Sequence, residues 1–206
     1  MKSKTHWENV YKTKATTEVS WFQAHAERSL QLIHDAAVPR SAPIIDVGGG
    51  ASTLVDDLLT EGYAQVTVLD LSGSALEKTK IRLGTRAAQV RWLEANVLQA
   101  ELAARSYAVW HDRAVFHFLT VEADRQAYVR QLLHAVNPGG YVIVATFAED
   151  GPSQCSGLPV MRYSAQELSD QLGAPFQLLD HQKEVHHTPG GNEQKFVYCL
   201  FRLAGL

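Results

Sequence analysis

Short runs of apolar residues alternate along the chain with segments whose apolar residues recur every three or four positions. A continuous run predicts a buried strand, and the wider spacing predicts a helix with one apolar face. The predicted strands are residues 42–47, 65–71, 89–95, 106–111 and 141–148, and the predicted helices are residues 20–37, 52–62, 74–84 and 123–136. This alternation is typical of a doubly wound α/β fold with a parallel sheet.

The pattern changes after residue 148. A loop rich in glycine, proline and serine is followed by a predicted short helix at residues 164–173. Two strand-like segments, residues 176–187 and 195–203, are separated by "TPGGNEQ", which predicts a hairpin turn. A parallel sheet that ends in a hairpin differs from a plain nucleotide-binding fold.

Composition narrows the class of protein. The chain has 206 residues, enough for one domain with a substantial core, and its 46% hydrophobic and 20% charged residues exclude a disordered or fibrous chain. A net charge of -3 gives no overall field that would attract nucleic acid. Cys155 and Cys199 lack CxxC spacing, which suits a reducing compartment. No apolar stretch approaches the ~20 residues of a membrane span, and the N-terminus lacks a signal-peptide pattern, so we expect a cytoplasmic protein.

A glycine run follows the first predicted strand in "PIIDVGGGASTLVDDLL". Ligands of open α/β sheets bind at the carboxyl ends of the strands, where glycines let a ligand approach the backbone. Gly48 and Gly50 match the dinucleotide pattern G-x-G-x-x-G, but Thr53 stands at its third glycine. Asp46 precedes the run, and a carboxylate there suits a ligand with an amino group or a sulfonium better than a pyrophosphate.

Polar residues also follow the next two strands. Asp70 ends the second strand, where an acid can accept both ribose hydroxyls of an adenosine. Asn96 follows the third strand and can hydrogen-bond an adenine edge. Each residue alone also fits a loop or cap role, but three at successive strand ends favour a ligand site.

With these motifs the sequence resembles the class I S-adenosylmethionine-dependent methyltransferases. The resemblance spans residues 44–146 and rests on the segments "IIDVGGGAS", "VTVLDLS", "LEANV", "YAVWHDRAVFHFLT" and "VNPGGYVIVATF". It implies a seven-stranded α/β sheet in the order 3-2-1-4-5-7-6 with strand 7 antiparallel. We expect one domain over residues 1–206, made of an N-terminal helical lid (1–40), a cofactor-binding core (41–150) and a substrate-side loop, helix and hairpin (151–206).

The resemblance also implies a cofactor, S-adenosylmethionine, and roles for individual residues. Asp46 and the Gly48 backbone would hold its methionine part, Asp70 its ribose, and Asn96 with Val97 its adenine. The full expected cofactor-binding set is Asp46, Gly48, Gly49, Gly50, Ser52, Asp70, Leu71, Asn96, Val97, His111 and Trp21. Two members depart from the family pattern, since Ser52 replaces a frequent glycine and Asn96 replaces the commoner aspartate.

Methyl transfer depends mainly on positioning, which can supply about 7–11 kcal/mol of the barrier, and a catalytic base is optional. The catalytic candidates lie in "WHDRAVFHF". His111 and Asp112 are base or orienting candidates, although Asp112 also fits a cap of the following turn. Arg113 can hold a substrate anion bidentately, whereas His117 among its aromatic neighbours suits the core.

Two other regions carry candidate chemistry. Trp7, Tyr11, Trp21 and Phe22 lie in the lid-like N-terminal segment and can form either an aromatic wall around a cationic ligand or buried anchors of a terminal helix. Cys155 is either a substrate-facing thiol or a small apolar residue in a loop. His186 and His187 are adjacent on a predicted strand and point to opposite faces, so we expect no metal site.

The sequence therefore predicts a methyltransferase that acts on a small molecule, without a nucleic acid or membrane partner. Protein-lysine methylation is the alternative within the class, because "HDRAVFHFL" is similar to a segment of lysine-modifying relatives. A nicotinamide-dependent oxidoreductase and a cofactor-binding module without catalysis are further alternatives. The acceptor atom and the oligomeric state stay open.

Overall fold

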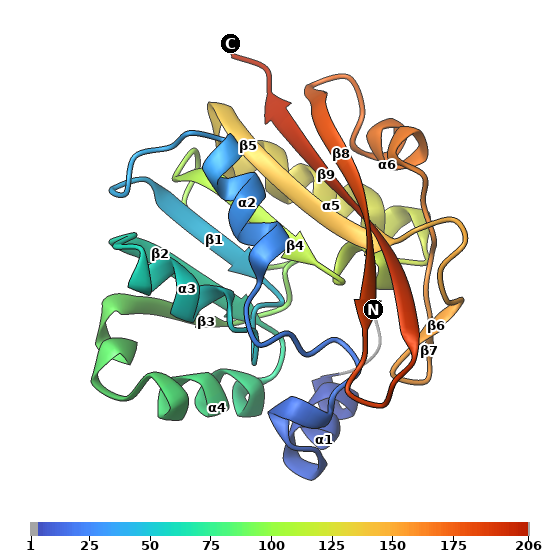
Figure 1. Ribbon diagram of the computed structural model, residues 1–206. Helices are drawn as coiled ribbons and strands as arrows, with labels where there is room; N and C mark the ends of the chain where they lie inside the picture. The colour runs from blue at the N-terminus through green and yellow to red at the C-terminus, as the bar shows by residue number, and fades with distance from the viewer. Residues whose placement is uncertain (1–3, 206) are drawn as a thin grey trace.

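A seven-stranded sheet in the order β3-β2-β1-β4-β5-β9-β8 forms the centre of the computed structural model, which describes residues 4–205 (Figure 1). Its strands are β1 (Pro43–Val47), β2 (Gln65–Asp70), β3 (Val90–Glu94), β4 (Tyr107–Arg113), β5 (Val136–Phe147), β8 (Phe176–His187) and β9 (Glu193–Leu203). β1 to β5 pair in parallel, whereas β9 is antiparallel to both β5 and β8. The predicted α/β fold and strand order are confirmed. Residues 1–3 of the predicted lid and residue 206 lie outside the described range.

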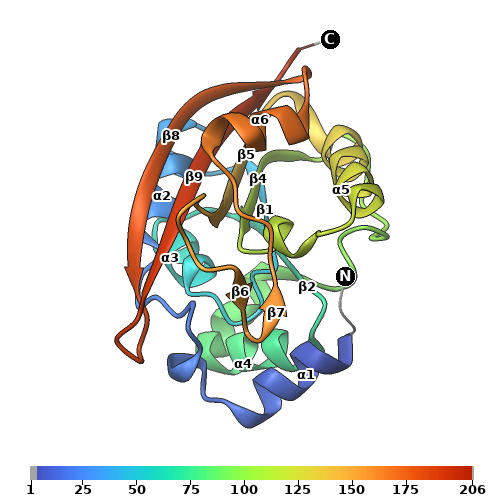
Figure 2. The ribbon, with the colours of Figure 1, turned by 90° about the vertical axis from the view of Figure 1, so that its right-hand side faces the viewer.

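Helices cover both faces of the sheet (Figures 1 and 2). They are α1 (Lys4–Thr13), α2 (Glu27–Asp35), α3 (Leu54–Thr60), α4 (Gly73–Leu83), α5 (Glu122–Ala135) and α6 (Ala165–Leu172), with the short 3₁₀ helices η1 (Thr16–Glu18), η2 (Gly84–Gln89) and η3 (Phe116–Phe118). Apolar residues of α2, α3 and α4 pack on one face, and those of α5 and α6 pack on the other. A small hairpin of β6 (Gln154–Cys155) and β7 (Leu158–Pro159) follows β5. None of the helices within residues 4–205 has the length and apolarity needed to cross a membrane.

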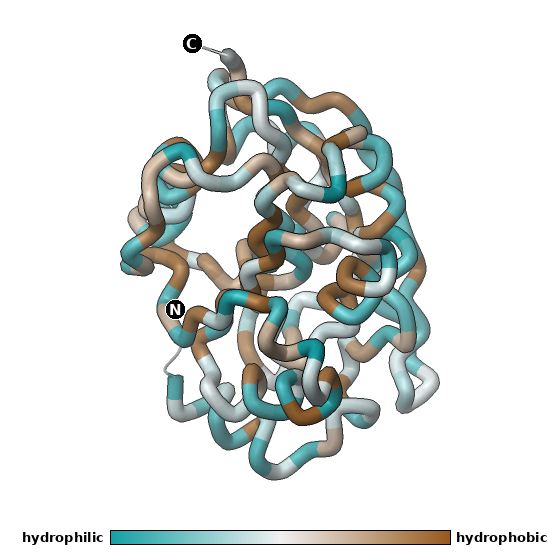
Figure 3. The backbone as a smooth tube through the Cα atoms, turned by 90° about the vertical axis from the view of Figure 1, so that its left-hand side faces the viewer, coloured by the Kyte–Doolittle hydropathy of each residue, from teal (hydrophilic) through white to brown (hydrophobic). Residues whose placement is uncertain are grey.

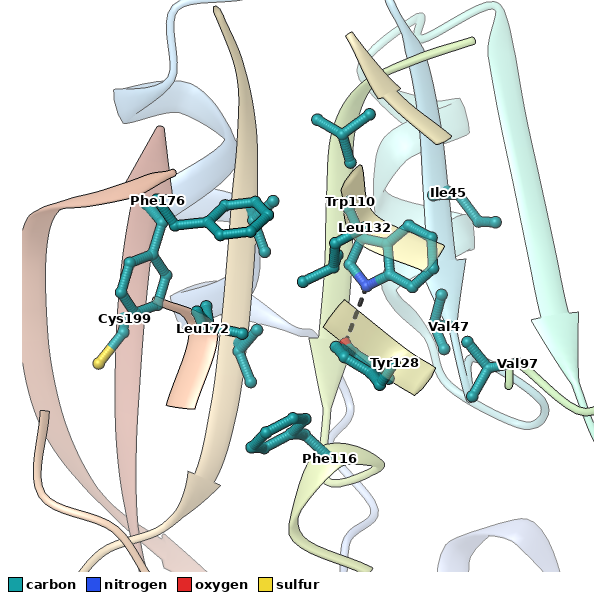
Figure 4. Packing of buried hydrophobic residues seen from close by; sticks show 14 of the residues in the cluster. Ile45, Val47, Val97, Trp110, Phe116, Tyr128, Leu132, Leu172, Phe176 and Cys199 are labelled. Carbon is teal, nitrogen blue, oxygen red and sulfur yellow. Dashed lines mark hydrogen bonds between the residues drawn. The ribbon is translucent and has the colours of Figure 1, made fainter. Parts of the chain in front are cut away.

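Hydrophobic and hydrophilic stretches alternate along the backbone, as expected for buried strands and half-buried helices (Figure 3). On the α5 face, polar groups in the core are linked by hydrogen bonds (Figure 4). The Trp110 indole N–H donates to the Tyr128 hydroxyl at 2.9 Å, and that hydroxyl donates to Asp112 at 2.6 Å. Because all three side chains are fully buried, these two hydrogen bonds fix the end of β4.

The N-terminal segment differs from the prediction. The helix predicted over residues 20–37 begins only at Glu27, and residues 4–13 form the additional helix α1. The carbonyl oxygen of Trp21 accepts a hydrogen bond from Arg113 at 3.1 Å, and that of Gln23 accepts one from Thr53 at 3.1 Å. These tertiary hydrogen bonds hold the residues before Glu27 out of the helix, which local helical spacing cannot reveal.

Two further boundaries depart from the prediction. β4 extends to Arg113, so all three candidate catalytic residues of "HDR" belong to the strand. β5 begins at Val136, so that "NPGG" lies in the strand and not before it. Val136 pairs with Tyr107, and the register shifts between Tyr107 and Val109. This irregularity lets the chain turn from α5 directly into β5.

Candidate active site

Two adjoining pockets open where β1, β2 and β4 end, beneath α1. The first holds about 700 Å³ and the second about 530 Å³, each including the space at its mouth. Tyr11, Trp21, Gly48 and Arg113 line both pockets and mark the boundary between them. The pockets therefore lie at the edge of the sheet where an open α/β fold binds its ligand.

A buried carboxylate forms one wall of the second pocket. Asp46 on β1 lies opposite His111 on β4, and its Oδ1 is 2.7 Å from the His111 Nδ1. The other oxygen, Oδ2, is buried and has no hydrogen-bond partner within residues 4–205. Because buried polar groups are nearly always paired, this oxygen is suited to a cationic donor such as an ammonium group.

The histidine beside Asp46 is itself held on both sides. Its Nε2 lies 2.8 Å from the Ser29 hydroxyl on α2, and both residues are buried. An ionised carboxylate only accepts hydrogen bonds, so Nδ1–H donates to Asp46 and Nε2 accepts from Ser29. With a hydrogen bond at each nitrogen, His111 orients Asp46. Ser29 was missed by the sequence analysis because a serine within a helix carries no distinguishing pattern.

The glycine run leaves room that any side chain would fill. A Cβ on Gly49 would lie 2.3 Å from Asp46 Oδ2, and one on Gly50 would lie 2.5 Å from Asp70 Oδ2. Gly48 has a φ of +70°, and its Cβ would lie 2.1 Å from a methyl carbon of Val115. The run therefore leaves, beside the two buried carboxylates, space that any side chain would occupy.

Asp70 ends β2 inside the first pocket. Its two oxygens accept the backbone N–H groups of Gly50 at 3.0 Å and Ser72 at 2.8 Å, and each retains a lone pair. Burial raises the pKa of Asp70 to about 7, and the nearby carboxylates of Asp46 and Glu8 add to the rise. Hydroxyl donors that reach this carboxylate would stabilise its ionised form.

The part of the first pocket where the sequence predicts the adenine is apolar. Leu71, Ala95 and Val97 line the first pocket, as the prediction for Leu71 and Val97 requires. Asn96 is not among the lining residues, and its side-chain oxygen accepts the Leu98 N–H at 3.0 Å. Ser52 lines the second pocket, with its hydroxyl accepting the Leu54 N–H at 3.1 Å. The side chains of Asn96 and Ser52 thus each accept a hydrogen bond from a backbone N–H two residues further along the chain. A direct role of either residue in binding stays a prediction.

Trp7 and Tyr11 of helix α1 line the first pocket. The helix lies beside α4 (Figure 2). The Glu8 carboxylate accepts hydrogen bonds from the Ser72 hydroxyl at 2.9 Å, the Ser74 N–H at 3.2 Å and the Ser74 hydroxyl. These bonds, the Ser74 hydroxyl foremost, lower the pKa of Glu8 to about 2. The helix N-terminus also favours a negative charge. Glu8 therefore holds the cover closed.

Aromatic rings close the mouth of the first pocket. Trp7 packs edge-on against Trp21 and Phe118, with ring centroids 5.9 and 5.2 Å apart. Tyr11 packs against Trp21 at 6.2 Å. Phe22, the fourth residue of the predicted aromatic wall, lines only the second pocket.

Arg113 reaches the pocket from the end of β4. Its Nε donates to the Tyr198 hydroxyl at 2.7 Å, its Nη1 donates to the Trp21 carbonyl at 3.1 Å, and its guanidinium lies 4.4 Å above the Phe196 ring. Its Nη2 is buried and without a hydrogen-bond partner in the described part of the chain. Because Nη1 donates only one of its two N–H groups to Trp21, donors on both Nη1 and Nη2 remain for a ligand.

Asp112 points away from the pockets. It accepts the backbone N–H groups of Val115 at 2.8 Å and Phe116 at 3.1 Å besides the Tyr128 hydroxyl. It lines neither pocket. The geometry is that of the turn cap considered in the sequence analysis, and burial raises the pKa of Asp112 to about 6.

Cys155 lines the first pocket, and burial raises its pKa to about 12, so it is present as the thiol. His186 donates from Nε2 to the Ser20 carbonyl at 2.9 Å, whereas His187 is exposed. No group of three or more possible metal-ligating side chains occurs among residues 4–205.

Comparison with known proteins adds to this geometry. The family model described as "Methyltransferase domain" matches residues 44–140. The structure of a Burkholderia thailandensis N1-methyltransferase with bound 1,6-didemethyltoxoflavin and S-adenosylhomocysteine has a TM-score of 0.71 and 19% identity, covering 98% of this chain and 87% of that chain. The matched segment and the fold are those of the class I S-adenosylmethionine-dependent methyltransferases.

Other methyltransferase relatives cover this chain to different extents. Human EEF1A lysine methyltransferase 2 is 19% identical over 96% of this chain and 84% of its own length. An uncharacterized methyltransferase of Mycobacterium tuberculosis is 30% identical over 60% of this chain and 59% of its own length. The chain spans only 18% of the mouse eEF1A lysine and N-terminal methyltransferase, at 22% identity over 63% of this chain.

A structure from work on the conversion of a disulfide bond into a thioacetal group during echinomycin biosynthesis has a TM-score of 0.80. It is 17% identical and covers 98% of this chain and 93% of that chain. At this level of identity the likeness shows the methyltransferase fold alone. The acceptor must therefore be inferred from this chain's own pockets.

Proposed function

We propose that this methyltransferase uses S-adenosylmethionine to methylate a small-molecule acceptor. The observation that carries the cofactor assignment is the unpartnered Oδ2 of Asp46, which is buried within residues 4–205 beside a glycine run that leaves its approach open. Asp46 Oδ2 would accept the cofactor's ammonium group, Asp70 its ribose hydroxyls, and the wall of Leu71 and Val97 its adenine. When bound, S-adenosylmethionine supplies an electrophilic methyl group on a positively charged sulfur.

The chain's own contribution is positioning and the exclusion of water. Trp7, Trp21 and Phe118 form an apolar cover over the first pocket, and Glu8 holds it closed. Oriented reactants in a dry site account for about 7–11 kcal/mol of a barrier of this kind. We assign His111 to the positioning of Asp46, because both its nitrogens are engaged.

The size and cover of the pocket support a small acceptor. Protein-lysine methylation remains the second candidate, because the human lysine methyltransferase matches 96% of this chain. The guanidinium of Arg113 at the pocket argues against it, since a cation there repels the ammonium of an incoming lysine.

Two measurements test this proposal. Calorimetry with S-adenosylhomocysteine should show saturable binding, and the absence of heat and of any thermal shift would reject a cofactor site. Labelled S-adenosylmethionine should then transfer its methyl group to the small-molecule fraction of a matched lysate. Label in the protein fraction alone would replace this proposal with the lysine candidate, and binding without transfer to either fraction would indicate a non-catalytic module.

A further inference from the structure

A positive charge without an ion-pair partner among residues 4–205 lies at the boundary of the two pockets. Arg113 forms no ion pair with any residue in the 4–205 range, and its Nη2 has no hydrogen-bond acceptor there. A buried donor left unsatisfied costs about 1–3 kcal/mol, and more when it is charged. Nε and Nη1 of Arg113 have hydrogen-bond partners within the protein, whereas Nη2 has none among residues 4–205.

The neighbouring groups do not neutralise this charge. Glu184 lies 3.3 Å from the Tyr198 hydroxyl, but its carboxylate also accepts from Gln23 at 3.4 Å and lies 3.8 Å from Arg28. It is therefore shared with a second guanidinium and separated from Arg113 by the tyrosine.

Three titratable side chains near Arg113, those of His117, His186 and Cys155, are neutral. Burial, with the charge of Arg113, lowers the pKa of His117 to about 3 and also lowers the pKa of His186. Cys155 is a thiol because burial raises its pKa to about 12. Asp46 is engaged by His111 on the far side of the pocket boundary. The guanidinium of Arg113 therefore keeps its positive charge, and its Nη2 has no hydrogen-bond acceptor among residues 4–205.

The guanidinium lies at the boundary of the two pockets and is held mainly from β9. It stacks on Phe196 and donates to Tyr198, both on β9, and the first pocket that it lines also contains Phe118 and Cys155. Asp46 and the glycine run, by contrast, belong to β1 and the loop after it. Two of the groups that hold Arg113 thus come from the substrate-side hairpin, and the third is the Trp21 carbonyl.

We propose that the acceptor is a small organic anion, and that Nη2 of Arg113 binds its carboxylate or another ionised oxygen group. This inference rests on the proposed function. The aromatic cover suits a compact apolar or aromatic body attached to that group. Tyr198 engages Nε and the Trp21 carbonyl engages one N–H of Nη1, so the free donors are the N–H groups of Nη2 and the second N–H of Nη1.

The test compares acids with their neutral amides. The S-adenosylhomocysteine-saturated protein is titrated with benzoate against benzamide, and with phenylacetate against phenylacetamide, and the thermal shift is recorded. We expect each acid to bind about tenfold more tightly than its amide, in line with one charged hydrogen bond. Arg113→Gln should abolish this preference, and Arg113→Lys should retain part of it. Arg202→Gln is the matched control, because that guanidinium lies on the far part of β9 near Tyr141.

The outcomes separate this inference from the proposed function. A protein that does not bind S-adenosylhomocysteine removes the proposed function itself. Normal binding of S-adenosylhomocysteine without any preference for the acids overturns only the anionic acceptor. A preference that survives in Arg113→Gln also overturns it. An Arg113→Gln variant that loses S-adenosylhomocysteine affinity, while the acid preference is absent in the wild type, would assign Arg113 to the cofactor instead.

Discussion

The proposed cofactor end and the proposed acceptor end of the site differ in charge and in the elements that build them. The cofactor end is built from β1, β2 and the loops that follow them, and it presents the carboxylates of Asp46 and Asp70. The acceptor end is assembled from β4, η3, β6 and β9, and it presents the guanidinium of Arg113 among aromatic rings. The carboxylates at the first end favour a cationic nucleoside, and the guanidinium at the second end favours an anion. Each ligand would therefore be directed to its own end by its charge.

The largest expected effect comes from removing one charge at the cofactor end. Asp70→Asn should weaken S-adenosylhomocysteine binding roughly 100-fold, because hydrogen bonds to an ionised group contribute about 1.5–3 kcal/mol each. Isothermal calorimetry measures the change. Asp180→Asn, an exposed carboxylate on β8, is the matched control and should leave the affinity unchanged. Equal affinities of Asp70→Asn and the wild type would show that the ribose is not held there.

The same comparison explains which parts of the site could be predicted from the sequence. Asp46, the glycines and Asp70 lie at strand ends next to their own loops, so local spacing was sufficient to find them. The contacts of Arg113 come from Tyr198 and from the Trp21 carbonyl, which are distant in the sequence and meet only through the sheet order. Ser29 and the free nitrogen of Arg113 could not be inferred without knowing those partners.

The secondary structure also divides into elements that local sequence patterns determine and boundaries that distant residues determine. Periodic apolar runs predicted the central strands and the terminal hairpin, because burial on both faces is recorded in the sequence itself. The start of α2 at Glu27 was not predicted, since hydrogen bonds from Arg113 and Thr53 hold the preceding residues extended. Asp112 was likewise ambiguous until Tyr128 on α5 was seen to reach it.

A smaller effect should appear with pH, and only at the cofactor end. The pKa of Asp70 is raised to about 7, chiefly by burial, and ribose hydroxyls donate to its ionised form. S-adenosylhomocysteine affinity should therefore be about tenfold weaker at pH 6 than at pH 8, as expected for one group titrating near 7. The free protein should show the opposite sign. Because the pKa is higher in the folded than in the unfolded chain, this group's contribution to stability is lost as pH rises toward 7. In Asp70→Asn both slopes should flatten, and an unchanged slope would assign the titration to another group.

The smallest effect is expected at the cover that joins the two ends. Glu8→Gln removes the charge that accepts hydrogen bonds from Ser72 and Ser74, so α1 should open more often. We expect S-adenosylhomocysteine affinity to fall about threefold to tenfold, consistent with a loss of roughly 1 kcal/mol in an exposed network, and amide hydrogen exchange in α1 to become faster. Because the pKa of Glu8 is lowered to about 2, this effect should be the same at pH 6 and pH 8, unlike that of Asp70. Glu77→Gln, on the exposed surface of α4, is the matched control. If exchange in α1 were the same in Glu8→Gln and Glu77→Gln, the cover would be held by Trp7 and Tyr11 packing against Trp21 and not by the Glu8 carboxylate.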